Sequence, residues 1–173
     1  ELHNTNLDLV SNIQTSFELF TATAKEKNLT YEISIDKALP HYVIGDKTKL
    51  VQIFNNLIGN AIKFTNKGSV KFFVNVIENK GSEVIVEFRV QDTGIGITKD
   101  QEKILFKAFS QGDASITREF GGTGLGLIIS KKLARMMGGD VNFKSLDQGG
   151  TEFCFFTRFT VSSMTKEHSD CLL

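Results

Sequence analysis

The sequence contains no tryptophan, a single proline and only two cysteines among its 173 residues. Two cysteines, Cys154 and Cys171, provide neither a disulfide framework nor the ligand set of a structural metal site. Cys154 lies among phenylalanines, so we expect it to be a small buried hydrophobic residue. This cysteine usage is typical of a reducing compartment.

Net charge and long apolar runs are absent as well. Lysine plus arginine and aspartate plus glutamate both number 20, so no net field favours nucleic acid or an anionic membrane surface. No apolar run approaches the roughly 20 residues that cross a bilayer. The first residues, Glu1 to Asn6, lack the basic start and apolar core of a signal peptide. We therefore expect no nucleic-acid partner and no membrane segment in this chain.

With 40% hydrophobic residues, the chain is long enough for one well-buried domain. Apolar residues recur at helical or alternating spacing in most of it. The spacing predicts helices over 8–27, 47–64, 99–107 and 125–137, strands over 29–35, 70–77 and 84–91, and a final hairpin of 141–146 and 152–159. This mixture predicts an α+β fold, a two-layer sandwich in which a mixed, mostly antiparallel sheet packs against about three helices. We expect the domain to cover residues 1–160 and a polar tail or linker to cover 161–173.

The stretch Asp92-Thr93-Gly94-Ile95-Gly96-Ile97 follows an apolar strand directly. Its two glycines allow a tight turn and the close approach of another group. A carboxylate held at such a turn can accept a hydrogen bond from a donor such as the exocyclic amine of adenine. D-x-G-x-G also describes an ordinary polar turn, so the remaining motifs decide between the two interpretations.

The helix expected over 47–64, for which Asp46 is a plausible N-cap, carries a polar stripe beside its apolar face. Asn56, Asn60 and Lys63 are consecutive rungs of this stripe. Amide oxygens suit Mg²⁺ that also keeps waters and substrate phosphates, and a lysine one turn further can meet phosphate as a point charge. A solvated helix face is the alternative, but asparagine has a low helix propensity, which favours a functional stripe.

The run Gly121-Gly122-Thr123-Gly124-Leu125-Gly126-Leu127 opens the next expected helix, after a polar segment from Ser110 to Thr123 without clear periodicity. Free N–H groups and the positive dipole end make a helix start an anion site. The sequence contains no G-x-x-x-x-G-K-[ST], which excludes a P-loop. The run follows a polar loop rather than a strand, which argues against a Rossmann turn.

Together these motifs resemble the ATP-binding catalytic domain of sensor histidine kinases, within the GHKL superfamily shared with type II topoisomerases, MutL mismatch-repair proteins and ninety-kilodalton heat-shock chaperones. The resemblance covers nearly the whole chain to about residue 160, and its ordered blocks are Gln52 to Thr65, Asp92 to Ile97, Leu105 to Gln111, Gly121 to Leu127 and Gly149 to Thr151. The stretches Thr117 to Phe120 and Met137 to Gly139 are most similar to hybrid-type kinases.

The resemblance implies a Bergerat-type fold, ATP and Mg²⁺ as cofactors, and a role for each block. It implies that Asn60 coordinates Mg²⁺, that Asn56 supports metal and phosphates, and that Lys63 contacts phosphates. The residues implied around the base and in the lid are Asp92 as acceptor for the adenine amine, Gly94 and Gly96 in the pocket wall, Ile97 and Thr151 in its floor, Phe106 and Phe109 as lid anchors, the run Gly122, Thr123, Gly124, Leu125 and Gly126 over the phosphates, and Arg118 at the γ-phosphate. An exposed loop charge is the alternative interpretation of Arg118.

Two departures refine the expected function. Relatives that hydrolyse ATP carry a glutamate one turn before the metal asparagine, whereas this chain has Asn56, and an amide cannot act as a general base. We therefore expect slow hydrolysis and phosphoryl transfer instead. His3, His41 and His168 all lack the context of a phosphoacceptor histidine. The partner implied by the resemblance is thus a separate helical dimerisation domain of the parent kinase, on the cytoplasmic side, with a receiver domain and membrane anchoring of the parent left open.

Two other functions remain open at this point. One is a non-catalytic nucleotide-binding signalling module, against which the intact Asn60, Asp92 and glycine run argue. The other is an ATP-hydrolysing conformational clamp, against which Asn56 argues.

Overall fold

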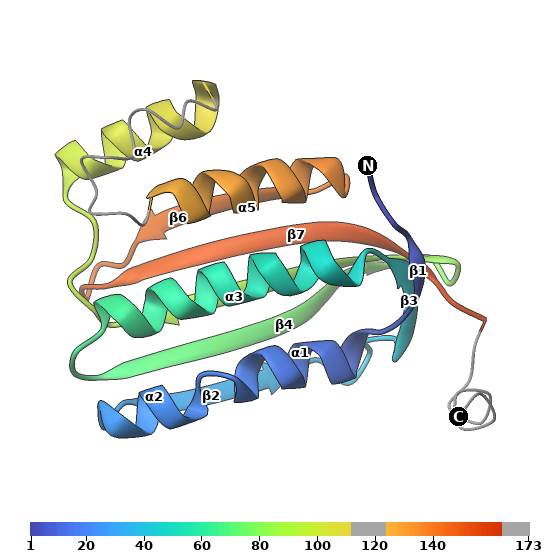
Figure 1. Cartoon of the computed structure of the whole chain (residues 1–173), viewed down its shortest axis with the longest axis horizontal. Coiled ribbons are helices and arrows are strands. Elements are labelled where there is room, and N and C mark those ends of the chain that lie inside the picture. Colours follow the sequence, from blue (N-terminus) through green and yellow to red (C-terminus); the bar gives the residue numbers. More distant parts are fainter. Residues whose placement is uncertain (112–123, 164–173) are drawn as a thin grey trace.

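The computed structural model describes residues 1–111 and 124–163, apart from the side chains of 106, 108–111 and 124–125. A seven-stranded sheet carries its helices on one face (Figure 1). The elements in chain order are β1 (Thr5–Asp8), α1 (Leu9–Glu18), α2 (Thr21–Glu26), β2 (Thr30–Ile35), β3 (Tyr42–Gly45), α3 (Lys47–Phe64), β4 (Ser69–Asn79), β5 (Glu83–Asp92), α4 (Lys99–Gln111), α5 (Gly124–Met136), β6 (Asp140–Ser145) and β7 (Thr151–Val161). The expected two-layer α+β architecture is confirmed.

The strands follow the order β1-β3-β7-β5-β4-β2, with β6 also paired to β7. Among the described pairings, β2 runs parallel to β4 and the others are antiparallel. Side chains of β4, β5 and β7 alternate between a face buried under the helices and a face left open. The buried face holds a cluster of phenylalanine rings, Phe54, Phe72, Phe88 and Phe155, in which Phe54 of α3 lies 4.9 Å from Phe88 between ring centroids.

Helix α3 crosses the middle of this sheet and is the longest helix (Figure 1). Asp46 is its N-cap as predicted, and its Oδ1 accepts from the backbone N–H of Lys49 at 3.1 Å. Apolar residues at helical spacing bury one side of the helix completely. Thr65 leaves helical geometry with φ −107° and ψ 111°, so the helix ends where the sequence predicts.

The helix expected over 8–27 is wrong in one respect, because it is two helices. Asp8 caps α1, which ends at Glu18, and α2 starts at Thr21. The break brings the ring of Phe20 against α3, where a Cβ on Gly59 would lie 3.4 Å from that ring. In one continuous helix, the direction of the Phe20 side chain would be set by the helical repeat of about 100° per residue instead.

Two short strands, β1 and β3, have no counterpart among the predicted elements. They pair with each other at one end of the sheet, and β3 continues onto the last residues of β7. Of the helices, α4 lies outside the main helical layer, beyond α5 (Figure 1). It extends from Lys99 to Gln111, four residues beyond the predicted end. Within the described ranges, none of the helices has the length and apolar character that crossing a bilayer requires.

Candidate functional site

Three predicted motifs meet at the end of the molecule away from the N terminus (Figure 1). The end of α3 contacts the turn after β5, where the Ile95 N–H donates to the carbonyl of Phe64 at 3.4 Å. Asp92, the last residue of β5, pairs with Thr151, the first residue of β7. The end of the asparagine helix, the Asp92 turn and the Gly149–Thr151 turn therefore lie together at one end of the sheet.

Asp92 is a buried carboxylate at the edge of this site, with 5% of its surface exposed. Its Oδ1 accepts from the backbone N–H of Gly94 at 2.9 Å, and the backbone of Thr151 donates to it as well. Burial raises the pKa of Asp92 above its usual value, and these two backbone hydrogen bonds offset the shift only in part. The carboxylate therefore retains acceptor capacity that no described side chain uses.

The glycines of the turn are required by close approach and by backbone geometry. A Cβ on Gly94 would overlap the carbonyl oxygen of Phe64, and one on Gly150 would overlap the carbonyl of Asp92. Gly96 and Gly150 also have positive φ values of 72° and 93°. A side chain at Gly94 would separate the Asp92 turn from α3, and one at Gly150 would separate it from the β6–β7 turn, whereas at Gly96 the cost is backbone strain.

Thr151 and Ile97, both predicted for the floor of the base pocket, lie in this region. Thr151 is buried beside Asp92, with 4% of its surface exposed. Ile97 is half-buried and packs against the hydrophobic core, and its carbonyl accepts from the hydroxyl of Ser145 at 3.4 Å. Their positions are compatible with the predicted floor, although the contact with a base stays a prediction.

Asn56 joins α3 to the next helix. Its Nδ2 donates to the carbonyl of Gly126 at 3.2 Å and to Oγ of Ser130 at 3.1 Å, both on α5. Both bonds are made by the amide nitrogen, and the amide oxygen Oδ1 takes no part in them. Gly126 lies against this amide, since a Cβ there would approach it at 3.7 Å. Asn56 therefore has a tethering role that the sequence does not predict.

Asn60 and Lys63 continue the same stripe toward the end of α3. Asn60 is half-buried, and its amide forms no hydrogen bond with a described residue. Lys63 is exposed, and its Nζ lies 5.6 Å from the centroid of the Phe64 ring. Mg²⁺ that keeps phosphate and water ligands is suited by neutral oxygen ligands. Asn60 offers such an oxygen, and Oδ1 of Asn56 offers a second one helical turn earlier. The residues present fit the implied metal and phosphates.

Several predicted residues lie outside what the structure describes. Arg118, Gly122 and Thr123 fall within 112–123, and the side chains of Phe106, Phe109 and Leu125 are not described. Gly124 and Gly126 open α5, as the glycine run predicts. The lid therefore stays a prediction, while the helix start that follows it is placed beside Asn56.

Ser130 is a residue of the site that sequence reasoning missed. It is completely buried on α5 and accepts the hydrogen bond from Asn56. Its neighbours on the same helix face, Leu127 three residues before it and Ala134 four residues after it, are buried apolar residues. A serine within an apolar helical stripe was the available signal, since such a hydroxyl requires a partner.

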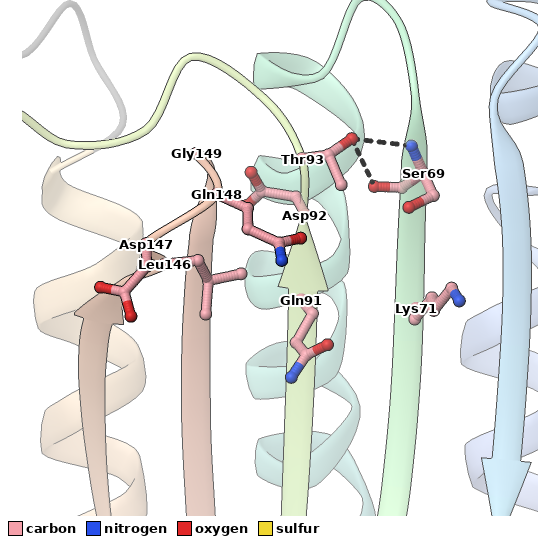
Figure 2. Close-up of a pocket in the computed structure, with 9 residues that line it drawn as sticks. All are labelled: Ser69, Lys71, Gln91, Asp92, Thr93, Leu146, Asp147, Gln148 and Gly149. Carbon is pink, nitrogen blue, oxygen red and sulfur yellow. Dashed lines mark hydrogen bonds between the residues drawn. The ribbon is translucent and has the colours of Figure 1, made fainter.

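A cavity of about 440 Å³ opens at the same end of the sheet, and Asp92 is among the residues that line it, together with residues of the open face (Figure 2). Lys71 and Gln91 contribute to it, and by strand alternation their side chains point away from α3. Behind them Glu152, 4% exposed, accepts from Gln91, from Lys144 at 3.0 Å and from Arg89 at 3.4 Å. The hydrogen bonds and positive charges outweigh desolvation and lower the pKa of Glu152.

Known proteins with a similar sequence are sensor kinases. Residues 45–161 match the model of the family "Histidine kinase-, DNA gyrase B-, and HSP90-like ATPase". The chain is 44% identical over 137 residues to the signal transduction histidine-protein kinase BarA of Escherichia coli K12, covering 79% of this chain and 15% of the relative. It is 36% identical over 173 residues to hybrid signal transduction histidine kinase B of Dictyostelium discoideum, covering 95% of this chain and 9% of the relative. The chain thus spans a small part of the curated relatives that it matches.

Solved structures agree with this match. Full-length ShkA in complex with AMPPNP superposes with a TM-score of 0.75 at 30% identity, over 95% of this chain and 33% of that one. The catalytic domain of histidine kinase ThkA shares the fold, with a TM-score of 0.67 at 23% identity over 92% of this chain and 97% of that one. With Asp92, the asparagine stripe and the opening of α5 assembled at one end of such a fold, the chain belongs to the histidine kinase-, DNA gyrase B- and HSP90-like ATPase family, as a catalytic ATP-binding domain of the two-component sensor histidine kinases.

Proposed function

We propose that this domain binds Mg²⁺-ATP between α3, the Asp92 turn and the start of α5, and that it transfers the γ-phosphoryl group to a histidine of a separate helical domain. The observation that carries the proposal is Asp92, a buried carboxylate that accepts two backbone hydrogen bonds and is bonded by no described side chain, in a turn whose Gly94 packs on the end of α3. An ionised carboxylate can accept about four hydrogen bonds, so the two backbone donors of Asp92 leave acceptor positions open for a ligand.

Each residue of the site has a proposed part. Asp92 accepts a hydrogen bond from the exocyclic amine of adenine, with Ile97 and Thr151 in the floor beneath the base. Gly94 and Gly96 shape the wall. On α3, the amide oxygen of Asn60 is the proposed metal ligand, supported by Asn56, while the ammonium of Lys63 contacts phosphate. These roles are inferred from the donor set and its placement.

The remaining proposed roles belong to the lid. Phe106 and Phe109 anchor it, Gly122, Thr123, Gly124, Leu125 and Gly126 close over the phosphates, and Arg118 reaches the γ-phosphate. The position of Gly126 against Asn56 supports this assignment, because it brings the glycine-bearing helix start next to the asparagine stripe. Free N–H groups at a helix start attract phosphate oxygens.

The chemistry proposed for the site is phosphoryl transfer rather than hydrolysis. Mg²⁺, when bound, offsets the charge that develops on the phosphate oxygens. Lys63 contributes positive charge, and Asp92 orients the nucleotide through its base. Asn56 directs its amide nitrogen to α5 and has no carboxylate with which to activate a water molecule. We infer that the attacking nitrogen comes from a histidine outside this chain, because His3, His41 and His168 lack the sequence context of a phosphoacceptor.

The partners are also proposals. We infer a helical dimerisation and phosphoacceptor domain in the parent protein, because the relatives are much longer than this chain and several are named hybrid kinases. A receiver domain in the same parent or in a separate protein is the proposed next acceptor. The domain would work on the cytoplasmic side, whether or not the parent is anchored in a membrane.

Calorimetry with a non-hydrolysable ATP analogue, with Mg²⁺ and with EDTA, tests the binding proposal. Saturable binding that weakens in EDTA supports it, and no binding under either condition overturns it. Transfer is then tested by adding ATP and a purified helical phosphoacceptor domain and following phosphohistidine. Binding without transfer would favour a nucleotide-binding signalling module, and rapid release of free phosphate would favour a hydrolysing clamp.

A further inference from the structure

Lys27 lies directly after α2, far from the site in sequence, yet its side chain reaches the end of α3. Its Nζ donates to the carbonyl oxygens of Ile62 at 2.7 Å, Thr65 at 3.0 Å and Lys63 at 3.2 Å. One ammonium group with three hydrogens thus meets three carbonyls.

These contacts complete the end of α3. The last carbonyls of an α-helix have no partner within the helix, and a cation there is also favoured by the helix dipole. Lys27 holds the carbonyls of Ile62 and Lys63, and the Ile95 N–H from the Asp92 turn donates to the carbonyl of Phe64. The end of α3 is therefore held from two sides, by Lys27 and by the turn that carries Asp92.

The same helical turn bears proposed ligand contacts. Asn60 lies just before Ile62, and Lys63 supplies one of the bound carbonyls itself. On the other side, Gly94 packs so closely on the carbonyl of Phe64 that no Cβ fits between them. A shift or fraying of this last turn would move the metal and phosphate groups relative to the Asp92 turn.

We propose that Lys27 is a positioning residue for nucleotide binding, which acts by fixing the last turn of α3 against the Asp92 turn. This inference rests on the proposed function, since it assigns Lys27 a role in that same site. Lys27 itself touches no proposed ligand group except through the backbone of α3. Its contribution is the orientation of Asn60 and Lys63 rather than direct contact with phosphate.

The test compares Lys27→Met with wild type and with Lys25→Met. Methionine keeps an apolar stem of similar length without the ammonium group. Lys25 is an exposed lysine of α2 whose side chain makes no hydrogen bond or ion pair with a described residue, so it controls for the loss of one positive charge. Affinity for Mg²⁺-ADP is measured by calorimetry well below the unfolding temperature of each variant.

We expect Lys27→Met to weaken Mg²⁺-ADP binding by about tenfold, as is typical for residues that orient ligand groups, and Lys25→Met to bind like wild type. Lys27→Arg should recover most of the affinity, because a guanidinium group can donate to the same carbonyls. If Lys27→Met does not fold, Lys27→Gln replaces it and should show a smaller loss than tenfold. Wild-type affinity in the folded methionine or glutamine variant overturns the inference.

A double-mutant cycle with Lys63→Met separates positioning from stability alone. If Lys27 orients Lys63, removing both should cost less affinity than the sum of the two single losses. Strictly additive losses would show that Lys27 does not act through this turn. If wild type itself binds no nucleotide, the proposed function fails and not this inference in particular.

Discussion

Asp92 and Glu152 are two buried carboxylates at the same end of one sheet, and their surroundings are opposite. Asp92 ends β5 on the face toward the helices, while Glu152 stands one residue along β7 and its side chain lies on the open face. Their exposed fractions are nearly equal, at 5% and 4%. Burial alone therefore does not separate a functional acid from a structural one.

The two carboxylates differ in the hydrogen-bond donors that surround them. Glu152 is surrounded by side-chain donors, namely Gln91, Lys144 and Arg89, which lower its pKa. Among the described residues, Asp92 has donors from the backbone alone, so burial dominates and its pKa is raised. The two acids differ in their donors, because three side chains meet Glu152 whereas Asp92 is left with acceptor positions that no described side chain fills.

The sharpest test of this contrast is nucleotide affinity. Asp92→Asn should weaken binding of Mg²⁺-ADP by about 10- to 100-fold, the value of a hydrogen bond to a charged group, because the amide cannot reproduce the full acceptor. Glu152→Gln, the matched change on the open face, should leave affinity near that of wild type. Calorimetry on both variants measures this, and equal losses would contradict the assignment of Asp92.

The second expected effect is on the free energy of unfolding, and here the Glu152 variant should lose more than the Asp92 variant. Glu152→Gln should lower the free energy of unfolding by about 1–3 kcal/mol, because it removes a charged acceptor from a satisfied network. Asp92→Asn should be neutral or stabilising, since it replaces a desolvated charge. Urea unfolding followed by circular dichroism gives both values, and a larger loss for Asp92→Asn would reverse the comparison.

A smaller effect concerns acid pH. The folded-state pKa of Glu152 is below its usual 4.5, so its stabilisation is complete above 4.5 and is lost as pH falls through the lower folded value. The folded pKa of Asp92 is above its usual 3.8, so its destabilisation disappears as pH falls toward 3.8. Each unit of pKa difference corresponds to about 1.4 kcal/mol.

Unfolding free energies at several pH values, for wild type and both variants, should therefore diverge in opposite directions. On acidification the advantage of wild type over Glu152→Gln should shrink, whereas wild type should gain relative to Asp92→Asn. Parallel curves for the two variants would show that both carboxylates titrate alike.

The smallest expected effect is that of Ser130→Ala, which tests the hydrogen bond between Asn56 and α5 on the helix-covered face. Loss of the hydroxyl removes one of the two acceptors of the Asn56 amide and should lower the free energy of unfolding by about 0.5–1.5 kcal/mol. Ser11→Ala, at an exposed helical serine of α1 whose hydroxyl makes no hydrogen bond with a described residue, is the control. Thermal unfolding measures both, and an equal response would argue that the Asn56–Ser130 bond contributes nothing.

Much of this fold could be predicted because its main elements carry strong local signals. Helix α3 has a capping aspartate and an apolar stripe, and β4 and β5 alternate strictly, so their predicted and observed limits agree within two residues. Strands β1 and β3 have four residues each and form only through pairing with distant strands. The break at Phe20 likewise depends on Gly59 of another helix. Contacts between residues that are distant in sequence produce no periodic pattern from which such features could be predicted.

In the candidate site, too, some features could be predicted from the residues and others depend on tertiary contacts. Asp92, its glycines and the α3 stripe were predicted from residue chemistry, and the structure brings them to one end of the sheet. The amide of Asn56 was predicted as a ligand group, but its nitrogen is engaged by Gly126 and Ser130, about 70 residues away in sequence. Spacing along one helix indicates which side chains share a face and not which neighbouring helix meets them.

The tether from Asn56 to α5 also bears on how such a domain could exchange one chemistry for another. A glutamate at position 56 would present only acceptor oxygens to the Gly126 carbonyl, which is an acceptor too, so the bond to the first turn of α5 would be lost. Introducing a water-activating carboxylate there would thus also loosen the helix that follows the lid. In the proposed function, the amide at this position would favour phosphoryl transfer over hydrolysis in two ways, through its bonds to α5 and through its inability to act as a base.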